Sequence, residues 1–154
     1  SAVSVKLTGG ANPEDLDSHT LGANASEHVY YSDKGSLAAA PFIGLDVDDT
    51  DSFGPEVTTF AKLAKNRTYR FFVRNFSGTF DPGQTGSPAR IELSNRGAQS
   101  IFTPPAGETS STDYWHVFDL TTDANCNATV VPVQQFLADP PAPINTDENA
   151  QYCN

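Results

Sequence analysis

Short runs of alternating apolar and polar residues, separated by glycine and proline, dominate this sequence and limit what it can fold into. The clearest run is Thr68–Phe76, where the apolar residues Tyr69, Phe71 and Val73 occupy every second position. Side chains two residues apart in an extended strand point to the same side of a sheet. A period of two therefore predicts half-buried strands, and no segment has the period expected of a convincing amphipathic helix.

Nine such runs are expected to form strands, and turn-forming sequences such as Asp81-Pro82-Gly83 and Asn95-Arg96-Gly97 separate them. Many short strands joined by tight turns predict an all-β fold, an antiparallel β-sandwich of the immunoglobulin-like or jelly-roll-like kind. Ser36–Ala40 is the one weak candidate for a helical turn. The expected strands are Ser1–Thr8, His28–Ser32, Ile43–Val47, Glu56–Leu63, Thr68–Phe76, Ala89–Leu93, Gln99–Phe102, Tyr114–Leu120 and Thr129–Val133.

The length of 154 residues is sufficient for one domain with a real hydrophobic core. We expect residues 1–137 to form the sandwich and residues 138–154 to form a proline-rich tail. Asp139-Pro140-Pro141-Ala142-Pro143 indicates an extended polyproline segment, because proline cannot donate to a central strand.

The net charge of −10 argues against nucleic acid or an anionic membrane as a partner, since both require a basic surface. No apolar run approaches the roughly 20 residues of a membrane-spanning helix, so membrane insertion is not expected. A chain that begins Ser1-Ala2-Val3 and contains no methionine is expected to be a mature, processed product. These features favour a secreted, extracellular or cell-surface protein.

Cys126 and Cys153 are the only cysteines, and an even number in an acidic chain indicates a disulfide formed in an oxidising compartment. The bridge would tie the tail to the last strand and stabilise the fold by on the order of 3 kcal/mol in the chain-entropy model. Two unpaired buried thiols and an intermolecular bridge are the alternatives.

Four Asn-x-Ser/Thr sequons lie near expected turns or strand ends, where a glycan could be accommodated. In a eukaryotic source we expect at least one to be glycosylated, whereas in a bacterial source they carry little meaning. The four asparagines are Asn24, Asn66, Asn75 and Asn127.

Two acidic clusters, one within residues 12–19 and one within residues 44–56, are the most distinctive local feature. Carboxylates packed this densely repel one another, and calcium takes several such oxygen ligands at once. If the clusters meet at one rim of the sandwich, a calcium ion would offset the repulsion. Turn hydrogen bonds and solvated charge are the alternative, and a zinc site with His19 and His28 is disfavoured by their spacing. The candidate calcium ligands are Asp15, Asp17, Asp46, Asp48, Asp49 and Asp51.

No sequence pattern indicates a catalytic set, and we expect the protein not to be an enzyme. The chain has no Gly-x-Ser-x-Gly motif and no glycine-rich phosphate loop. His116 lies in an aromatic strand, which favours packing over a role as a general base. Tyr30, Tyr31 and Trp115 could stack on sugar rings if exposed, although aromatic residues in strands more often pack in a core.

Several motifs together resemble a secreted β-sandwich module of bacterial surface and exported proteins, mostly uncharacterised. They are Asn-Pro-x-Asp-Leu-Asp-Ser-His from Asn12, His-Val-Tyr-Tyr-Ser-Asp-Lys from His28, Leu-Asp-Val-Asp-Asp-Thr from Leu45, Gly54-Pro55-Glu56, and the run from Tyr69 to Gly78. The resemblance covers about Leu7 to Val133. It implies an extracellular, non-catalytic module similar to small calcium-dependent sandwich domains. Asp15, Asp17, Asp46, Asp48 and Asp49 match its signature positions. The sequons and the cysteine-bearing tail depart from it.

Taken together, these patterns predict a secreted structural or adhesive β-sandwich, calcium-stabilised and suited to be a subunit of an extracellular coat, filament or appendage. Its expected partners are other copies of itself or other extracellular proteins, with Ser1–Thr8 or the tail reaching a neighbour by strand addition. The alternative is a carbohydrate-binding module, which requires a row of exposed aromatic residues on one sheet face. A small hydrolase is a third and weaker hypothesis.

Overall fold

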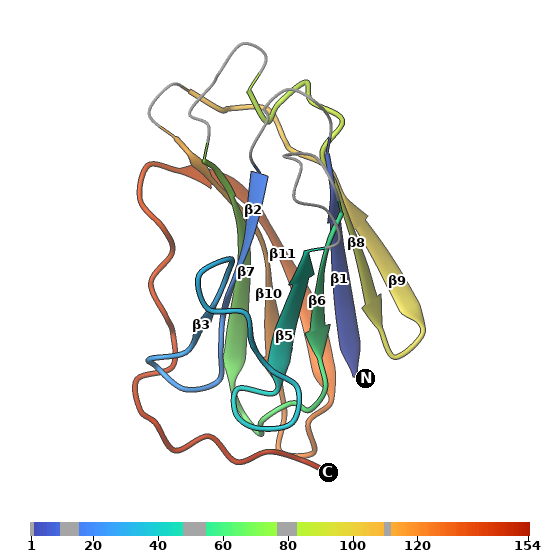
Figure 1. Ribbon diagram of the computed structural model, residues 1–154, viewed down its shortest axis with the longest axis vertical. Coiled ribbons are helices and arrows are strands. Elements are labelled where there is room, and N and C mark those ends of the chain that lie inside the picture. The colour runs from blue at the N-terminus through green and yellow to red at the C-terminus, as the bar shows by residue number, and fades with distance from the viewer. Residues whose placement is uncertain (1, 10–15, 48–54, 77–82, 110–111) are drawn as a thin grey trace.

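The computed structural model describes residues 2–9, 16–47, 55–76, 83–109 and 112–154, which form two antiparallel sheets packed face to face (Figure 1). The first sheet has six strands in the order β4-β5-β6-β1-β8-β9, and the second has five in the order β11-β10-β7-β2-β3. The predicted all-β sandwich is therefore confirmed. No described helix is long and apolar enough to cross a membrane.

The chain passes between the two sheets several times. Strands of the first sheet are β1 (Val3–Thr8), β4 (Gly35–Ser36), β5 (Ile43–Val47), β6 (Glu56–Phe60), β8 (Arg90–Asn95) and β9 (Ala98–Phe102). Strands of the second sheet are β2 (Leu16–Leu21), β3 (His28–Val29), β7 (Thr68–Asn75), β10 (Tyr114–Thr122) and β11 (Ala128–Leu137).

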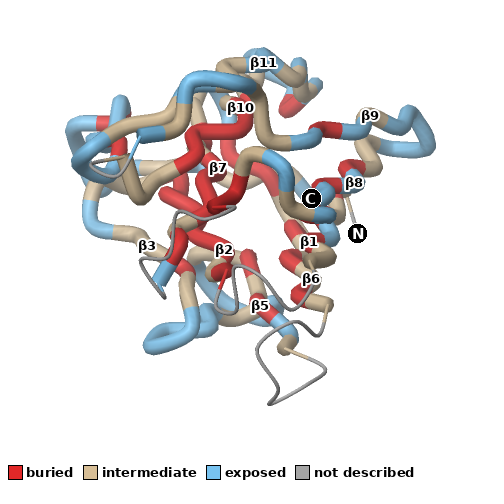
Figure 2. The backbone as a smooth tube through the Cα atoms, turned by 90° about the horizontal axis from the view of Figure 1, so that it is seen from above, coloured by how far each residue is buried: buried red, intermediate tan, exposed pale blue. Residues whose placement is uncertain are grey.

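The core lies between the sheets and is built from the inward residues of each alternating strand (Figure 2). Tyr69, Phe71 and Val73 of β7 all point inward, as the sequence predicts, and each is at most 1% exposed. Trp115 is fully buried among them, so it packs in the core, the commoner fate of strand aromatics, and is not available to stack on a sugar. Burial of each large side chain of this kind stabilises the fold by about 1.5–3 kcal/mol.

Two strands were not anticipated from the sequence. Leu16–Leu21, which carries part of the first acidic cluster, forms β2 and pairs with β7 from Leu16↔Asn75 to Leu21↔Arg70. The residues from Ser36 to Ala40 form no helical turn, so that expectation is wrong. Instead, Gly35 and Ser36 form β4, and the Ser36 hydroxyl accepts hydrogen bonds from the Ala38 and Ala39 amides.

The tail of residues 138–154 folds back onto its own domain. The Arg70 guanidinium donates to the Ala142 carbonyl over 2.9 Å, and the buried Asn145 amide donates to the Gly22 and Thr68 carbonyls over 2.9 Å each. Near its end, Tyr152 forms an antiparallel bridge with Ala64. The tail is therefore an integral layer over one end of the second sheet.

Candidate functional site

The outer side of the second sheet carries a cluster of stacked rings that the alternation of β2 and β7 brings together. His19 lies opposite Phe72 in register, and both occupy outward positions. Their rings are nearly parallel, with centroids 4.8 Å apart and planes inclined by 11°. Phe72 is only 1% exposed although it faces away from the core, because neighbouring rings cover it.

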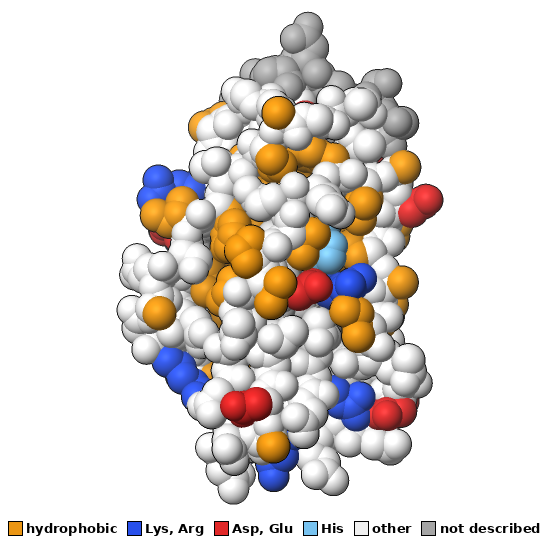
Figure 3. Space-filling view, turned by 180° about the vertical axis from the view of Figure 1, so that it is seen from behind, with side chains coloured by type: hydrophobic (Ala, Val, Ile, Leu, Met, Phe, Trp, Pro, Cys, Tyr) orange, Lys and Arg blue, Asp and Glu red, His pale blue; other side chains and the backbone are white. Residues whose placement is uncertain are grey.

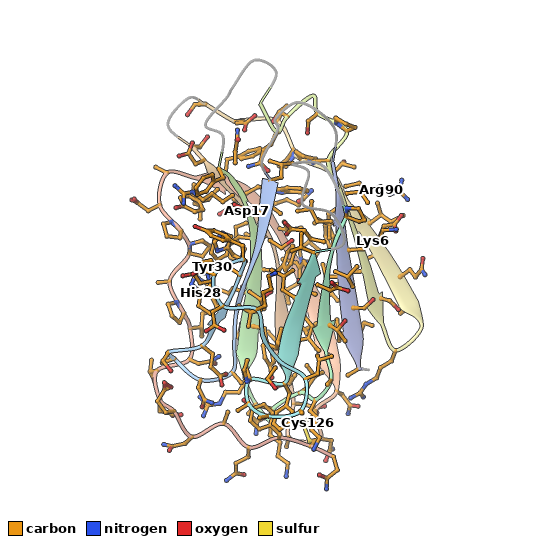
Figure 4. The ribbon with its side chains drawn as sticks, in the orientation of Figure 1. Lys6, Asp17, His28, Tyr30, Arg90 and Cys126 are labelled. Atoms are coloured by element: carbon orange, nitrogen blue, oxygen red, sulfur yellow. A yellow bond between two sulfur atoms is a disulfide. The ribbon has the colours of Figure 1, made fainter. Side chains whose placement is uncertain are left out.

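The next strand, β3, extends this stack. His28 and Tyr30 have ring centroids 4.1 Å apart, and Tyr30 also stacks on His19 at 5.3 Å. The Nδ1 atom of His19 lies 2.8 Å from Nε2 of His28, so one imidazole donates a hydrogen bond to the other. Figure 4 shows His28 and Tyr30 side by side, with Asp17 farther along β2.

Both histidines are held in the neutral form. Burial, together with the neighbouring His28 and Arg74, lowers the pKa of His19 to about 3. Burial also lowers the pKa of His28, although the Asp33 carboxylate opposes this effect. At neutral pH the pair is therefore an uncharged, ring-stacked part of the surface.

Two aromatic rings at one side of this stack are open to solvent. Tyr31 and Phe76 are each 49% exposed, and they meet edge to face with centroids 6.0 Å apart. Tyr31 also contacts Tyr30 edge to face at 5.3 Å. We call the whole cluster the aromatic face; it consists of His19, His28, Tyr30, Tyr31, Phe72, Arg74, Phe76 and Tyr114.

Arg74 is the cation of this face. Its guanidinium carbon lies 5.0 Å from the Phe76 ring centroid and 5.6 Å from that of Tyr114, which are cation–π distances. The Nε atom of Arg74 is buried and has no hydrogen-bond partner. The rings of Phe76 and Tyr114 therefore orient the guanidinium.

A hollow of about 230 Å³ adjoins the stack at the β3 edge. His28 and Asp33 line it together with Ser26, Glu27 and Pro41. Part of the polar lining is already bonded, since the Glu27 carboxylate accepts from the Asn24 amide over 3.0 Å. The hollow combines one wall of the ring stack with carboxylate oxygens.

A second polar group on the outer side of the same sheet contains His116. A bulge between His116 and Phe118 in β10 turns His116 and Asp119 to the same side. Nε2 of His116 is 2.7 Å from Oδ1 of Asp119, and Nε of Arg70 is 3.4 Å from the same oxygen. No hydroxyl or thiol of a described residue is hydrogen-bonded to His116 or Asp119. The ion pair of Asp119 with Arg70 ties β10 to β7.

The predicted calcium ligands are only partly placed. Asp17 occupies an outward position in β2 of the second sheet, opposite Arg74 in register. Asp46 occupies an outward, exposed position in β5 of the first sheet. These two carboxylates stand on the outer sides of different sheets. The other four, Asp15, Asp48, Asp49 and Asp51, lie outside the described residues, and no metal-binding group of three or more ligands occurs within the described ranges.

The predicted disulfide between Cys126 and Cys153 is confirmed, and its two cysteines have a sequence separation of 27. It lies at the end of the molecule where the tail finishes (Figure 4). Cys126 is 1% exposed, and the adjacent Cys153 amide donates to the Leu63 carbonyl over 2.9 Å.

The four sequons occupy different environments. Asn66 and Asn127 are exposed at the disulfide end of the molecule. Asn24 is partly buried, and its side-chain amide donates to Glu27 over 3.1 Å. Asn75 is 1% exposed, so its side chain has no room for a glycan in the folded chain.

Several residues of the aromatic face were not singled out from the sequence. An apolar Phe72 between the outward Arg70 and Arg74 was the available signal, because an apolar residue on a polar side must be covered or functional. The contribution of β2 is not predictable from the sequence, in which residues 12–19 stand out only as an acidic cluster. Elsewhere, apolar side chains gather over the middle of the molecule as seen from behind (Figure 3).

No protein-family model matches the sequence, and no curated protein matches it. One solved structure is similar in fold, a crystal structure described as that of the unknown function protein SAV2460. The two share 12% sequence identity with a TM-score of 0.62, and the match covers 92% of this chain and 94% of the other. The likeness supports the sandwich fold along nearly the whole chain.

Proposed function

We propose that this protein is a secreted, non-catalytic adhesive β-sandwich that acts by binding through its aromatic face. The observation that carries the proposal is the pair of half-exposed rings, Tyr31 and Phe76, which lie beside a stack of buried and partly buried rings. Exposed aromatic rings are costly to leave in water and gain free energy when a partner covers them. The disulfide is compatible with an extracellular location.

Binding is favoured over a reaction by the way the ionisable groups are used. His116 and Asp119 are bonded to each other beneath the outer surface, and Arg70 completes the group. His19 and His28 are neutral and stacked between rings. These arrangements connect strands and give the aromatic face a fixed shape.

Strand addition to a neighbouring subunit is not part of this proposal. β1 lies in the interior of the first sheet, where β6 and β8 occupy both its edges. The tail is bonded along its own domain and closed by the disulfide. Self-association, or binding to other extracellular proteins, would instead use the aromatic face as a preformed surface. Calcium binding by the acidic clusters remains a separate proposal about stability.

A carbohydrate partner is the second candidate, and the exposed rings favour it. The C–H faces of sugar rings pack on flat aromatic surfaces, while their hydroxyl groups need nearby hydrogen-bonding partners. Tyr31 and Phe76 supply the aromatic surfaces. The hollow at the β3 edge, lined by Asp33 and Ser26, supplies the hydrogen-bonding partners.

The test is a double substitution, Tyr31→Ala with Phe76→Ala, compared with Ile101→Ala as a matched control. Ile101 is an equally exposed apolar residue on β9, 53% accessible, but lies in the other sheet. We expect the double variant to lose binding to a broad glycan array or to immobilised extracellular proteins, and the control to retain it. Full binding by the double variant, or no binding by the unmodified protein, would overturn the proposal.

A further inference from the structure

We infer that the outer edge of β9 is an interaction surface, through which two copies of this chain pair strand to strand into a symmetric dimer. The inference goes beyond the proposed function and does not depend on the aromatic face, which belongs to the second sheet. It is carried by the openness of β9 compared with the other sheet edges.

The four edges of the two described sheets differ in how they receive a further strand. An edge presents unpaired backbone groups, and proteins commonly shorten, bend or charge such edges to prevent pairing. β3 and β4 have only two residues each. β11 contains Pro132, and a bulge in its pairing with β10 accompanies the positive φ of 54° at Gln134. The five residues of β9, Ala98–Phe102, include no proline, no charge and no positive φ.

The hydrogen-bond pattern determines which backbone groups of β9 point outward. The Arg96 amide donates to the Ala2 carbonyl next to β1, so the even-numbered residues of β8 point to β1 and the odd-numbered ones point to β9. Ser100 lies opposite an odd-numbered residue of β8 and is therefore bonded to it. The backbone groups of Gln99 and Ile101 consequently point away from the sheet.

This outer edge is accessible. Figures 1 and 2 both show the β8–β9 hairpin at the margin of the molecule, projecting from its body. Ile101 is 53% exposed, and Ala98 and Gln99 are exposed as well. Farther along, the Thr103 carbonyl accepts a hydrogen bond from the Gln134 side chain over 3.0 Å, so the open stretch ends there. The stretch is long enough for one short strand.

A second copy of β9 complements this edge. Antiparallel pairing about a two-fold axis at Ser100 places the outward backbone of Gln99 opposite that of Ile101 in the other copy, and the reverse. The free donors and acceptors of one edge then bond to those of the other. No segment of either copy has to leave its own fold, because β9 keeps its pairing with β8.

The charge distribution favours self-pairing at this place. With a net charge of −10, two copies repel each other in most orientations. β9 is uncharged, and on the adjacent strand Arg90 and Glu92 form an ion pair at 3.1 Å. Lys6 of β1, opposite Glu92 in register, adds a positive charge. Two copies that meet along β9 therefore experience less repulsion than their net charge would give.

The dimer should be weak, because one strand edge buries much less surface than the roughly 1,200–2,000 Å² of a standard interface. We expect a dissociation constant on the order of 100 μM. Sedimentation equilibrium of the disulfide-bonded protein, from about tenfold below to about tenfold above this value, measures it. The mass should rise from 16.5 kDa towards twice that value.

Ile101→Lys places a charge on the edge and should weaken the association at least about tenfold. Because Ile101 is 53% exposed, a lysine there disturbs no core packing. The matched control is Tyr31→Ala with Phe76→Ala, which removes exposed apolar side chains from the second sheet. The control should associate as the unmodified protein does.

Cysteine cross-linking tests the register. In the inferred pairing the two Ser100 residues face each other with Cα atoms about 4.5 Å apart, within the range of a disulfide. The two Gln99 residues lie diagonally and are too far apart to be bridged without backbone movement. Ser100→Cys should therefore form a covalent dimer at least about tenfold faster than Gln99→Cys. Gln99 is the more exposed of the two, so non-specific oxidation would give the opposite order.

The outcomes separate this inference from the proposed function. A mass of one chain at every concentration overturns the inference, as does cross-linking of Gln99→Cys at the rate of Ser100→Cys or faster. Association that survives Ile101→Lys but is lost in Tyr31→Ala with Phe76→Ala also overturns it, and would support the aromatic face as the surface of self-association. Binding of glycans or of other proteins by the aromatic face is measured separately and does not depend on β9.

Discussion

The Nδ1 atom of His19 lies 2.8 Å from Nε2 of His28, so two imidazoles share one hydrogen bond between β2 and β3. The β2–β3 pairing itself comprises only two residue pairs, Thr20↔Val29 and Leu21↔His28. The histidine contact and the ring stack on Phe72 therefore supply much of what holds β3 to the sheet. The shape of the aromatic face depends on this contact.

His19→Phe should make the protein more resistant to acid. The folded-state pKa of His19, about 3, lies below the ordinary histidine value of 6.5, so its neutral form stabilises the fold above pH 6.5. That contribution is lost as the pH falls from 6.5 towards 3, with a slope of at most about 1.4 kcal/mol per pH unit. Urea unfolding of both proteins from pH 7 to pH 4 measures the slope. An identical slope in His19→Phe would contradict the assignment.

Glu56→Gln should stabilise the protein at neutral pH. Burial raises the pKa of Glu56, an effect opposed by the hydrogen bond that its Oε1 accepts from the Ser18 amide over 2.9 Å. A raised carboxyl pKa gives a stabilising contribution that is complete below the unfolded value of 4.5 and is lost as pH rises through the folded value.

The glutamine variant keeps an acceptor for Ser18 but has no charge to desolvate. Its advantage in thermal unfolding should be largest at neutral pH and disappear near pH 4. As a control, Glu56→Ala leaves the Ser18 amide without its acceptor and should cost about 1–3 kcal/mol. A glutamine variant that is less stable than the unmodified protein at every pH would show that the charge is favourable.

Replacing both cysteines, Cys126→Ser with Cys153→Ser, should lower the free energy of unfolding by on the order of 3 kcal/mol. The bridge joins residues separated by 27 positions in sequence, and the closed segment includes all of β11 and the tail as far as Cys153. Denaturant unfolding of the double variant, with the reduced unmodified protein as a second measure, gives the value. Equal stability with and without the bridge would mean that the bonds of Asn145 and Tyr152 hold the tail unaided.

Removal of calcium by a chelator should lower the melting temperature, and Asp46→Asn with Asp48→Asn should abolish that difference. Asp17 and Asp46 lie on the outer sides of different sheets, so a separate Asp17→Asn variant distinguishes a site in the first acidic cluster from one in the second. Identical melting curves with and without chelator would show that bound calcium does not stabilise the protein.

Expression in a eukaryotic secretory host should give glycans on Asn66 or Asn127 and none on Asn75. The first two asparagines are exposed, whereas Asn75 is buried at the end of β7. Peptide mass spectrometry after deglycosylation in heavy-oxygen water reads each site. A high occupancy at Asn75 would require that glycan addition precedes folding and that the strand end adopts another structure.

The fold class was predictable because the alternation in strands such as β7 is local and strong. Tyr69, Phe71 and Val73 point into the core, and the pairing of Cys126 with Cys153 followed from their being the only cysteines. By contrast, β2 was hidden because Asp17 and His19 look like loop residues when their partners are unknown. Its strand character comes from pairing with β7, which is a tertiary property.

The candidate site was predictable only in its ingredients. Tyr30 and Tyr31 were recognised as available aromatics, but Trp115, which belonged to the same expectation, is fully buried in the core. The stacking of His19 on Phe72 depends on the register between β2 and β7. Residue spacing along one strand does not determine that register.

The interior position of β1 also constrains how the chain acquires its structure. Its two neighbours, β6 and β8, follow it by some fifty and more than eighty residues, as the register pairs Val3↔Phe60 and Val3↔Asn95 imply. Contacts so distant in sequence form slowly, because a long loop has to close before they gain any free energy. β1 therefore leaves the ribosome well before either of its partner strands has been made, and a chaperone that protects it in the meantime would speed folding.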